Sequence, residues 1–377
     1  MSIDLMGADW TLGFMPYGNR WRTNRRLFHR FFNISAVERL DPRLFRGIRG
    51  FLRRLAESPE DFADHTRLLG GSLILSIVYG IEVDSQENQF FANAQQATYS
   101  LGPALLPGTF LVDWIPSLKY LPSWLPGAGF HAVAKRARRK LDEMKNLPFD
   151  HVKDNMKSGS SYSPSIASTC LEELDELKTQ GVDEGTIRDL SAGVYVGGAD
   201  TPPVVLQDFI LAMVLHPHVL KKAQEEIDQL LGGERLPQYS DRPNLPYVSA
   251  VFKEIVRWRP PTPLSIPHRS MQDDVYEGYF IPAGTAVIEN VWAMSRDESI
   301  YPDPETFNPE RFIKDGHINP EVQDPEKFMS GHGRRYVSQR FAVDRHRPIS
   351  PPATRFLMHV FLVSFIAFAL ESISQPE

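Results

Sequence analysis

Gly197-Gly198-Ala199-Asp200-Thr201, followed by Pro202-Pro203, lies inside the longest apolar run in the middle of the chain. The flanking stretches, 189–196 and 204–215, carry few charges. A helix that is apolar on nearly every face has to be buried. This stretch therefore predicts the central helix of a mainly helical core.

The glycines and prolines make this helix locally unfavourable, at about 1 kcal/mol per glycine and about 3 per proline relative to alanine. Pro202-Pro203 lack the N–H groups that would bond back to the carbonyls of Gly198-Ala199, so the helix is expected to open there with Asp200 and Thr201 in the gap. Alternatively, one helix ends at 199–200 and Thr201 caps a second helix that starts with Pro202. The sequence leaves both readings open.

Composition limits the function classes. The chain has 377 residues, of which 42% are hydrophobic and 23% charged, and its net charge of -6 argues against a nucleic-acid partner. The single cysteine, Cys170, excludes internal disulfides and any multi-cysteine metal site. We expect no signal peptide or N-terminal anchor at Met1–Asp4. The apolar run 356–370 is shorter than the roughly 18 residues of a membrane span, so a tail or surface helix is expected, with membrane insertion as the alternative.

Apolar spacing of three and four residues predicts most of the other elements as helices. After Pro260-Pro261 the pattern becomes strand-like, and we expect a hairpin of 275–281 and 285–290 around a turn at Pro282–Gly284. The fold class is thus mainly α with a small β region, in a single domain over 1–377. The predicted helices cover 16–32, 40–55, 68–79, 165–179, 217–231 and 247–258.

Two groups of charged residues suggest sites. Trp21 and Arg25 lie four apart on one helix face. They belong either to a solvated basic face or to a place where an anion is held against an aromatic ring. Glu254 and Arg257 lie three apart among apolar residues, so they form a partly buried pair that needs further donors. Arg311 is the candidate to complete it.

The stretch from Leu105 to Phe130 combines four prolines with five aromatic side chains. It is too proline-rich for a long helix and too apolar for an ordinary loop. It could cap the core, rest on a membrane surface or form the lip of an apolar pocket.

Taken together, four motifs in this order resemble a cytochrome P450 of the fungal microsomal kind. Gly197–Thr201 is similar to the oxygen-groove motif of the family's long helix, and Glu254-Ile255-Val256-Arg257 to its ExxR motif. Phe307–Phe312 is similar to its PERF motif, and Trp21–Arg25 to its WxxxR helix. The resemblance extends from about Met15 to Arg335.

The resemblance implies a P450-like helical fold around that helix, a haem cofactor and electrons from NADPH through P450 reductase. It also implies an apolar small-molecule substrate, such as a terpenoid of fungal secondary metabolism, and a place on the endoplasmic reticulum membrane surface touched by 105–130. Asp200 and Thr201 would relay protons to iron-bound dioxygen. The remaining implied residues are the propionate partners Trp21, Arg25, His268, Arg269 and Arg335, and the structural triad Glu254, Arg257 and Arg311.

The chain departs from the family at the haem-ligand loop. Ser330–Tyr336 follows the family pattern, but Val337 occupies the cysteine position, so the sequence offers no metal ligand there, and 336–377 is an atypical tail. The family's anchor and first strands, expected before Met1, are also missing. A thiolate drives cleavage of the O–O bond, and valine has no lone pair. Cys170 lies before the central helix and cannot replace it.

We therefore expect the chain as written to be inactive as a monooxygenase. A gene-model fault and a true degenerate relative remain the two explanations of the altered loop. The alternative function is a catalytically silent P450-fold protein that binds an apolar ligand or a partner.

Overall fold

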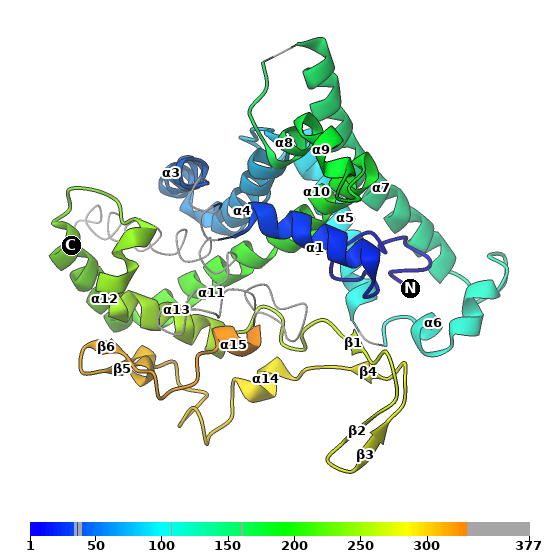
Figure 1. The fold of residues 1–377 in the computed structure, drawn as a ribbon. Helices are drawn as coiled ribbons and strands as arrows, with labels where there is room; N and C mark the ends of the chain where they lie inside the picture. The colour runs from blue at the N-terminus through cyan, green and yellow to red at the C-terminus, as the bar shows by residue number, and fades with distance from the viewer. Residues whose placement is uncertain (34–35, 37–39, 107, 160, 330–377) are drawn as a thin grey trace. The chain divides into compact units, whose positions relative to one another are not determined.

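The computed structural model describes residues 1–33, 36, 40–106, 108–159 and 161–329 (Figure 1). These residues are mainly helical with a few two- and three-residue strands, which confirms the predicted fold class. They form two compact units. The first holds the described residues of Met1–Phe51 and Glu60–Pro203, and the second holds Leu52–Pro59 and the described residues from Val204 onward. The single-domain assignment stays a prediction.

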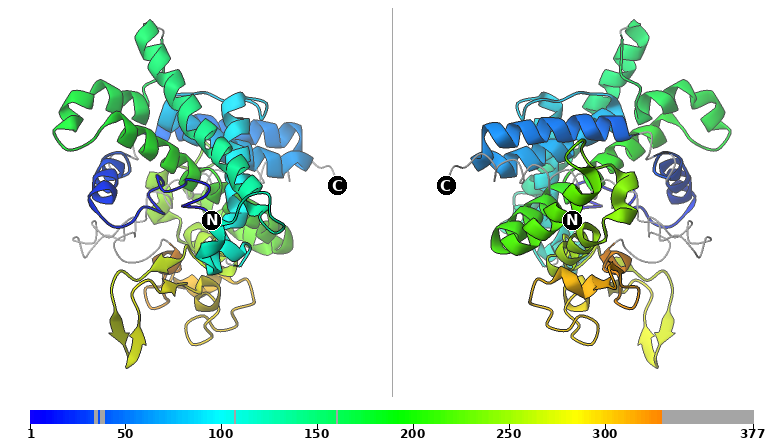
Figure 2. Two further views of the ribbon diagram at one scale, coloured as in Figure 1. Left: turned by 90° about the vertical axis from the view of Figure 1, so that its right-hand side faces the viewer. Right: turned by 90° about the vertical axis from the view of Figure 1, so that its left-hand side faces the viewer.

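The first unit is built on α4 (Phe62–Tyr79), which is buried from His65 to Tyr79 apart from Arg67 and Ser72. α10 (Glu184–Gly198) packs on α4, and the long α7 (Phe130–Ser158) runs beside α5 (Gln89–Leu105), as Figure 2 shows. The expected helix at 165–179 is two helices. The other elements of this unit are α1 (Asn19–Phe31), most of α3 (Asp41–Glu57), most of η1 (Pro59–Asp61), α6 (Leu111–Trp114), η2 (Pro116–Tyr120), α8 (Ile166–Glu172) and α9 (Leu174–Lys178).

The glycine and proline stretch interrupts the helix at Ala199-Asp200. α10 ends at Gly198 and α11 (Thr201–Leu215) begins at Thr201, which matches the two-helix alternative. α4 lies directly against the break, because a Cβ on Gly198 would come 2.8 Å from Ile74 Cδ1 and a Cβ on Gly70 would come 2.5 Å from the Ala199 carbonyl oxygen. Glycine is therefore needed on both helices for this close approach.

The prediction that this helix is buried on every face is wrong for part of α11. Val205, Leu206 and Phe209 are buried, but four apolar side chains remain exposed: Val204, Leu211, Val214 and Leu215. The Glu184–Leu215 stretch passes the length and hydropathy test for a membrane span, and half of its most apolar window is buried. A core helix passes the same test. The run 356–370 lies outside the described residues.

The second unit is centred on α13 (Pro246–Trp258), which is buried from Tyr247 to Arg257 and packs against α12 (Pro217–Leu231). Apolar side chains of α11, α12 and α13 form its core. Short elements complete the unit: η3 (Tyr239–Asn244), α14 (Val291–Met294), η4 (Pro309–Phe312) and α15 (Glu326–Met329).

The strands pair differently from the predicted hairpin. β2 (Asp274–Tyr276) pairs with β3 (Tyr279–Ile281), and the turn lies at Glu277-Gly278 instead of Pro282–Gly284. Both turn residues have positive φ, 49° and 85°, as a type I′ hairpin turn requires. The segment 285–290 pairs upstream instead. Its β4 (Ala286–Val287) joins β1 (His268–Arg269), and β5 (Ile313–Lys314) joins β6 (His317–Ile318).

Candidate functional site

A fully buried ion pair lies at the end of α13. Arg257 donates from Nε to Glu254 Oε2 and from Nη2 to Oε1, both at 2.7 Å, and neither side chain is exposed. The three-residue spacing of the helix places the two groups on one face. A bidentate guanidinium–carboxylate pair is among the stronger hydrogen-bonded arrangements in proteins.

Arg311 completes this cluster, so the structure brings the three predicted residues together. Its Nε lies 3.2 Å from both Glu254 oxygens, and the Asn308 N–H donates to Glu254 Oε1 at 2.8 Å. The other guanidinium donors of both arginines reach backbone carbonyls of the same irregular segment. Arg257 donates to Ser295 and Pro304, and Arg311 to Pro302, Asp303 and Thr306. The buried charges are therefore paired and hydrogen-bonded, and they tie the segment 295–311 to α13.

Glu226 of α12 caps the start of α13, a contact that we did not predict. Its carboxylate accepts hydrogen bonds from the N–H groups of Tyr247 at 2.8 Å and Val248 at 2.9 Å. These donors have no partner within their own helix, because the first turn of a helix leaves its N–H groups free. A carboxylate there also interacts favourably with the positive end of the helix dipole. The cap thereby defines the residue at which α13 begins, and so where Glu254 lies along the helix.

Replacing Glu226 by Ala is expected to lower the free energy of unfolding by about 0.5–2 kcal/mol, the range for loss of a helix cap. Urea unfolding followed by circular dichroism measures this. Glu226→Gln keeps one acceptor and should lose less. Glu225 is an exposed neighbour on the same helix, so Glu225→Ala is the matched control. An equal effect of both alanine variants would contradict the cap.

A second buried cluster lies beside the first and was also missed. Lys253 is 5% exposed, and its Nζ donates to Asp324 and lies 3.4 Å from Glu326 Oε1. Arg242 Nη2 reaches the same Glu326 oxygen at 3.5 Å. The signal in the sequence is a lysine immediately before Glu254 on an otherwise buried helix face. The cluster holds the segment before Phe328 against α13.

The other predicted residues are spread over the chain. Trp21 is buried on α1, and Arg25 lies on the same helix with Cζ 5.7 Å from the Phe28 ring centroid. Arg20 links α1 to α10 through Asp189, at 2.9 Å. His268 is exposed on β1 in the second unit. Arg335 and Val337 lie outside the described residues, and Trp21 and His268 belong to different units, so the grouping of the predicted propionate partners stays a prediction.

Asp200 and Thr201 lie at the break between α10 and α11. Asp200 is exposed, yet partial desolvation by the surrounding protein raises the pKa of its carboxyl. Burial also raises the pKa of Tyr195, with a contribution from the Asp200 charge. Asp200 and Thr201 are neighbours in sequence, so a carboxyl and a hydroxyl, two groups that can transfer protons, both belong to this break.

Cys170 is fully buried in α8. Desolvation raises the pKa of its thiol to about 12, although the Arg30 charge acts in the opposite direction. The side chain is therefore a neutral thiol at neutral pH, and neither a nucleophile nor a metal ligand. Among the described residues, no group of three or more His, Cys, Asp or Glu side chains could hold a metal ion.

The native chain is accordingly expected to resist alkylation by iodoacetamide at mildly alkaline pH and to react only once it is unfolded in urea. Mass spectrometry reads out the adduct. A variant with Cys170→Ser and Thr179→Cys moves the thiol to an exposed position nearby, and it should react rapidly in the folded state. Rapid labelling of native Cys170 would show that the thiol is accessible.

Comparison with known proteins gives one family. The family model described as cytochrome P450 matches residues 12–336. The monooxygenase COX2 of Coprinopsis cinerea, itself a cytochrome P450, is 44% identical over 91% of this chain and 66% of its own length. The corresponding values are 41%, 90% and 65% for ple1 of Rhodocybe pseudopiperita and 40%, 89% and 66% for a tryptamine 4-monooxygenase of Psilocybe cyanescens. The chain thus spans slightly less than two thirds of the curated relatives it matches.

Proposed function

The chain belongs to the cytochrome P450 family, and we propose that it carries the scaffold of a haem-dependent monooxygenase of an apolar small molecule, in a form that lacks the iron ligand. The observation that carries this proposal is the buried contact of Glu254 with Arg257 and Arg311. Arg311 reaches the buried Glu254–Arg257 pair from 57 positions along the chain, in the combination that the ExxR and PERF resemblance implies. We assign them the role of holding the irregular segment 295–311 on α13.

The residues present fit the propionate groups of a haem but not its iron. Trp21 and Arg25 supply an indole and a guanidinium from one helix, which are good partners for a propionate, with His268, Arg269 and Arg335 as further candidates. The residues do not supply the thiolate that would hold the iron, because Val337 has no lone pair and Cys170 is a buried neutral thiol. The sequence therefore offers no thiolate to the iron, and oxygen chemistry that depends on such a ligand is not available to this chain. Asp200 and Thr201 keep the proton-relay role as a proposal for a restored chain.

Partners and location follow from the family and are part of the proposal. We infer an NADPH-P450 reductase as electron donor for a restored chain, and contact with the endoplasmic reticulum membrane surface through 105–130. Support for the contact comes from the exposure of Trp114, Tyr120 and Trp124. The substrate is proposed to be an apolar fungal metabolite such as a terpenoid. We also propose that residues 1–377 act as one functional domain.

The second candidate function is binding of an apolar ligand or a partner without iron chemistry. The observation that favours it is Val337 in the cysteine position. This candidate requires that the folded chain bind an apolar ligand in the absence of haem.

The test compares the chain with a variant that carries Val337→Cys and the C-terminal segment of the Coprinopsis relative. Each is incubated with NADPH, reductase and a panel of terpenoids, with tryptamine included because one relative is named for it. We expect the restored variant alone to yield a product with one added oxygen atom. Ligand binding by both proteins with oxidation by neither would favour the silent-binding function.

A further inference from the structure

The β2–β3 hairpin of the second unit lies open to solvent. It runs from Asp274 to Ile281, and Figures 1 and 2 show it extending away from the other elements of its unit. Among the described residues it is a sheet of two strands without a third. A two-stranded hairpin is only marginally stable by itself in water, and further strands or a packed face are needed to stabilise it.

Both faces of this hairpin carry exposed apolar side chains. The register and the alternation of side chains place Val275 and Phe280 on one face and Tyr276 and Tyr279 on the other. All four side chains are 63% to 76% exposed. An antiparallel sheet normally buries one face, so the hairpin presents apolar surface that the described part of the chain leaves uncovered.

The outer edge of β3 has unpaired backbone groups. In a hairpin with a two-residue turn, the residues that flank the turn, here Tyr276 and Tyr279, form a hydrogen-bonded pair. Hydrogen-bonded and non-hydrogen-bonded pairs alternate, so the N–H and C=O groups of the next pair, Val275 and Phe280, point away from the hairpin. Within the described chain, no group outside the hairpin bonds to those of Phe280.

The outer edge of β2 is closed by comparison. The Val275 N–H donates to the carboxylate of Asp274 at 2.8 Å, and a charged side chain on an edge strand opposes pairing with another chain. On the other strand the open edge ends at Pro282, which has no N–H. The hairpin therefore offers one open edge, the uncharged Tyr279–Ile281 of β3.

We propose that two copies of this chain pair through their β3 edges as a symmetric antiparallel dimer centred on Phe280. In this register the two Phe280 residues form a hydrogen-bonded pair, in which each N–H donates to the C=O of the other copy. The product is a four-stranded sheet with the strand order β2-β3-β3-β2. Both copies use the same surface, so the assembly closes at two chains. The dimer goes beyond the proposed function and does not depend on iron chemistry.

The edge fits a second copy better than a lipid surface. In the dimer Tyr279 of one copy lies opposite Ile281 of the other, so no like charges meet across the new pairing. The antiparallel arrangement also places the two Glu277 turns at opposite ends of the sheet. Unpaired N–H and C=O groups are costly in lipid. The segment 271–281 carries three acidic side chains and no basic one, which opposes contact with anionic headgroups.

The exposed area predicts a weak dimer. A fully covered aromatic side chain buries about 150–250 Å², so Tyr276, Tyr279 and Phe280 of two copies together offer roughly 600–1,100 Å². Stable interfaces bury about 1,200–2,000 Å² in total, and smaller ones belong to transient complexes. We therefore expect a dissociation constant between about 1 μM and 1 mM, at which both species can be measured.

The test is sedimentation velocity of the full chain over a concentration series that spans this range. The mean mass should rise from one chain to two. Phe280→Pro removes the outward N–H and leaves the bonds within the hairpin, so dimerisation should weaken about tenfold or more, because both bonds of the central pair are lost. The matched control is Val275→Pro, which removes the outward N–H of the other edge. It should dimerise as the unaltered chain does.

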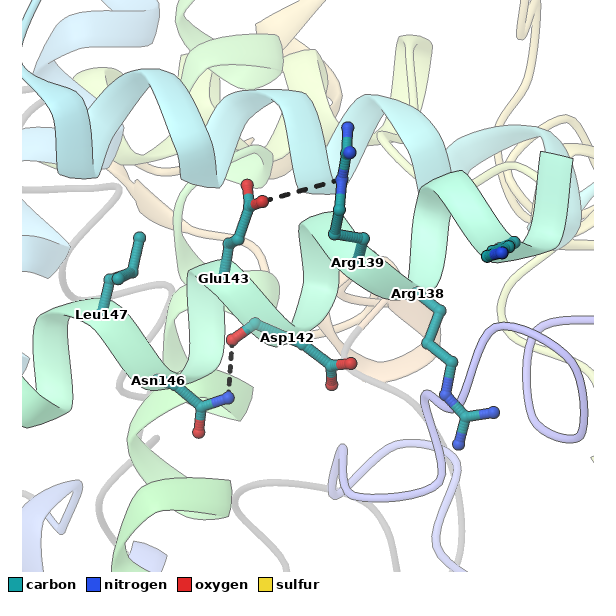
Figure 3. Close-up of a pocket in the computed structure, with 7 residues that line it drawn as sticks. Arg138, Arg139, Asp142, Glu143, Asn146 and Leu147 are labelled. Atoms are coloured by element: carbon teal, nitrogen blue, oxygen red, sulfur yellow. Dashed lines mark hydrogen bonds and ion pairs between the residues drawn. The ribbon is translucent and has the colours of Figure 1, made fainter. Parts of the chain in front are cut away.

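A charge variant keeps the proposal testable if the proline variants do not fold. Phe280→Arg places two like charges opposite each other in the central pair, so it should weaken dimerisation at least as much. Its control is Leu147→Arg on α7. Leu147 is 43% exposed and lines a shallow groove of about 440 Å³ in the first unit (Figure 3). This control adds the same charge at another exposed apolar position and should leave the dimer intact.

Four results would overturn the inference. The first is a chain that stays monomeric throughout the series. The second is equal weakening by the two proline variants or by the two arginine variants, which would place the contact elsewhere. The third is a mass that rises beyond two chains, because a closed pair cannot grow. The fourth is a monomer that floats with phosphatidylcholine vesicles unless it carries Phe280→Arg, which would make the hairpin a lipid contact.

Discussion

The reduced, carbon-monoxide-bound protein expressed from this sequence is expected to show no thiolate-type Soret band. The reason is the donor set of the chain. Val337 has no electron pair to give to iron, and the only thiol, Cys170, is buried with a pKa raised to about 12. A thiolate ligand is what distinguishes the iron of this family from that of globins or catalases. The thiolate-type Soret band that an intact relative shows is expected to be absent altogether.

The variant with Val337→Cys and the C-terminal segment of the Coprinopsis relative is the positive control for this prediction. It should gain the thiolate band when expressed with haem. A band shifted toward the imidazole or phenolate type from the unaltered chain would identify His332 or Tyr336 as a substitute ligand. A thiolate band from the unaltered chain would overturn the prediction. Absence of haem from both proteins would favour the silent-binding function.

Glu254→Gln is expected to be the most destabilising single substitution at the buried cluster. It removes the negative charge that Arg257 and Arg311 share, and Arg257 is fully buried. Removing one partner of a buried ion pair costs about 3–5 kcal/mol, because the other charge stays buried without compensation. The total stability of a domain is only about 5–15 kcal/mol. Urea unfolding should show a much lower midpoint with an unchanged slope.

A graded series keeps this prediction testable if Glu254→Gln does not accumulate. Arg311→Lys retains the positive charge but cannot reproduce the fork of hydrogen bonds, so an intermediate loss is expected. The control is Asp175→Asn, which breaks the pair with Lys178 at the same three-residue spacing, 2.8 Å apart, on the surface. This control should leave the midpoint where it is. A similar shift of the urea midpoint for the buried and exposed pairs would mean that burial does not determine how much stability is lost when one partner is removed.

The local elements follow from the amino-acid sequence alone. Spacing of three and four residues located α1, α3, α4, α12 and α13 to within a few residues at most ends, because that periodicity depends only on the helix and the side of it that is buried. The break at Ala199-Asp200 also follows from local chemistry, since Pro202-Pro203 provide no N–H for the preceding carbonyls. The three-residue spacing of Glu254 and Arg257 is likewise sufficient to put both on one face of α13.

Strand pairing was decided by the rest of the chain. The segment 285–290 reads as the second half of a hairpin, but β2 and β3 are closed by their own turn at Glu277-Gly278, and β4 pairs with β1. Two- and three-residue strands carry too little alternation to fix a register. The exposed apolar side of α11 is a further case. Composition predicts burial, but it does not say which sides of a helix the neighbouring elements cover.

The contacts that build the cluster on α13 depend most on tertiary structure. Arg311 reaches Glu254 across 57 positions of sequence, and Lys253 reaches Asp324 across 71. Motif resemblance suggested the first contact, but nothing in the local pattern identifies Glu226 as the cap of α13 or Asp324 and Glu326 as partners of Lys253. Periodicity specifies which side of an element is buried. Which charged groups meet there is fixed only when the folded chain brings distant segments together and removes the water that would otherwise solvate them.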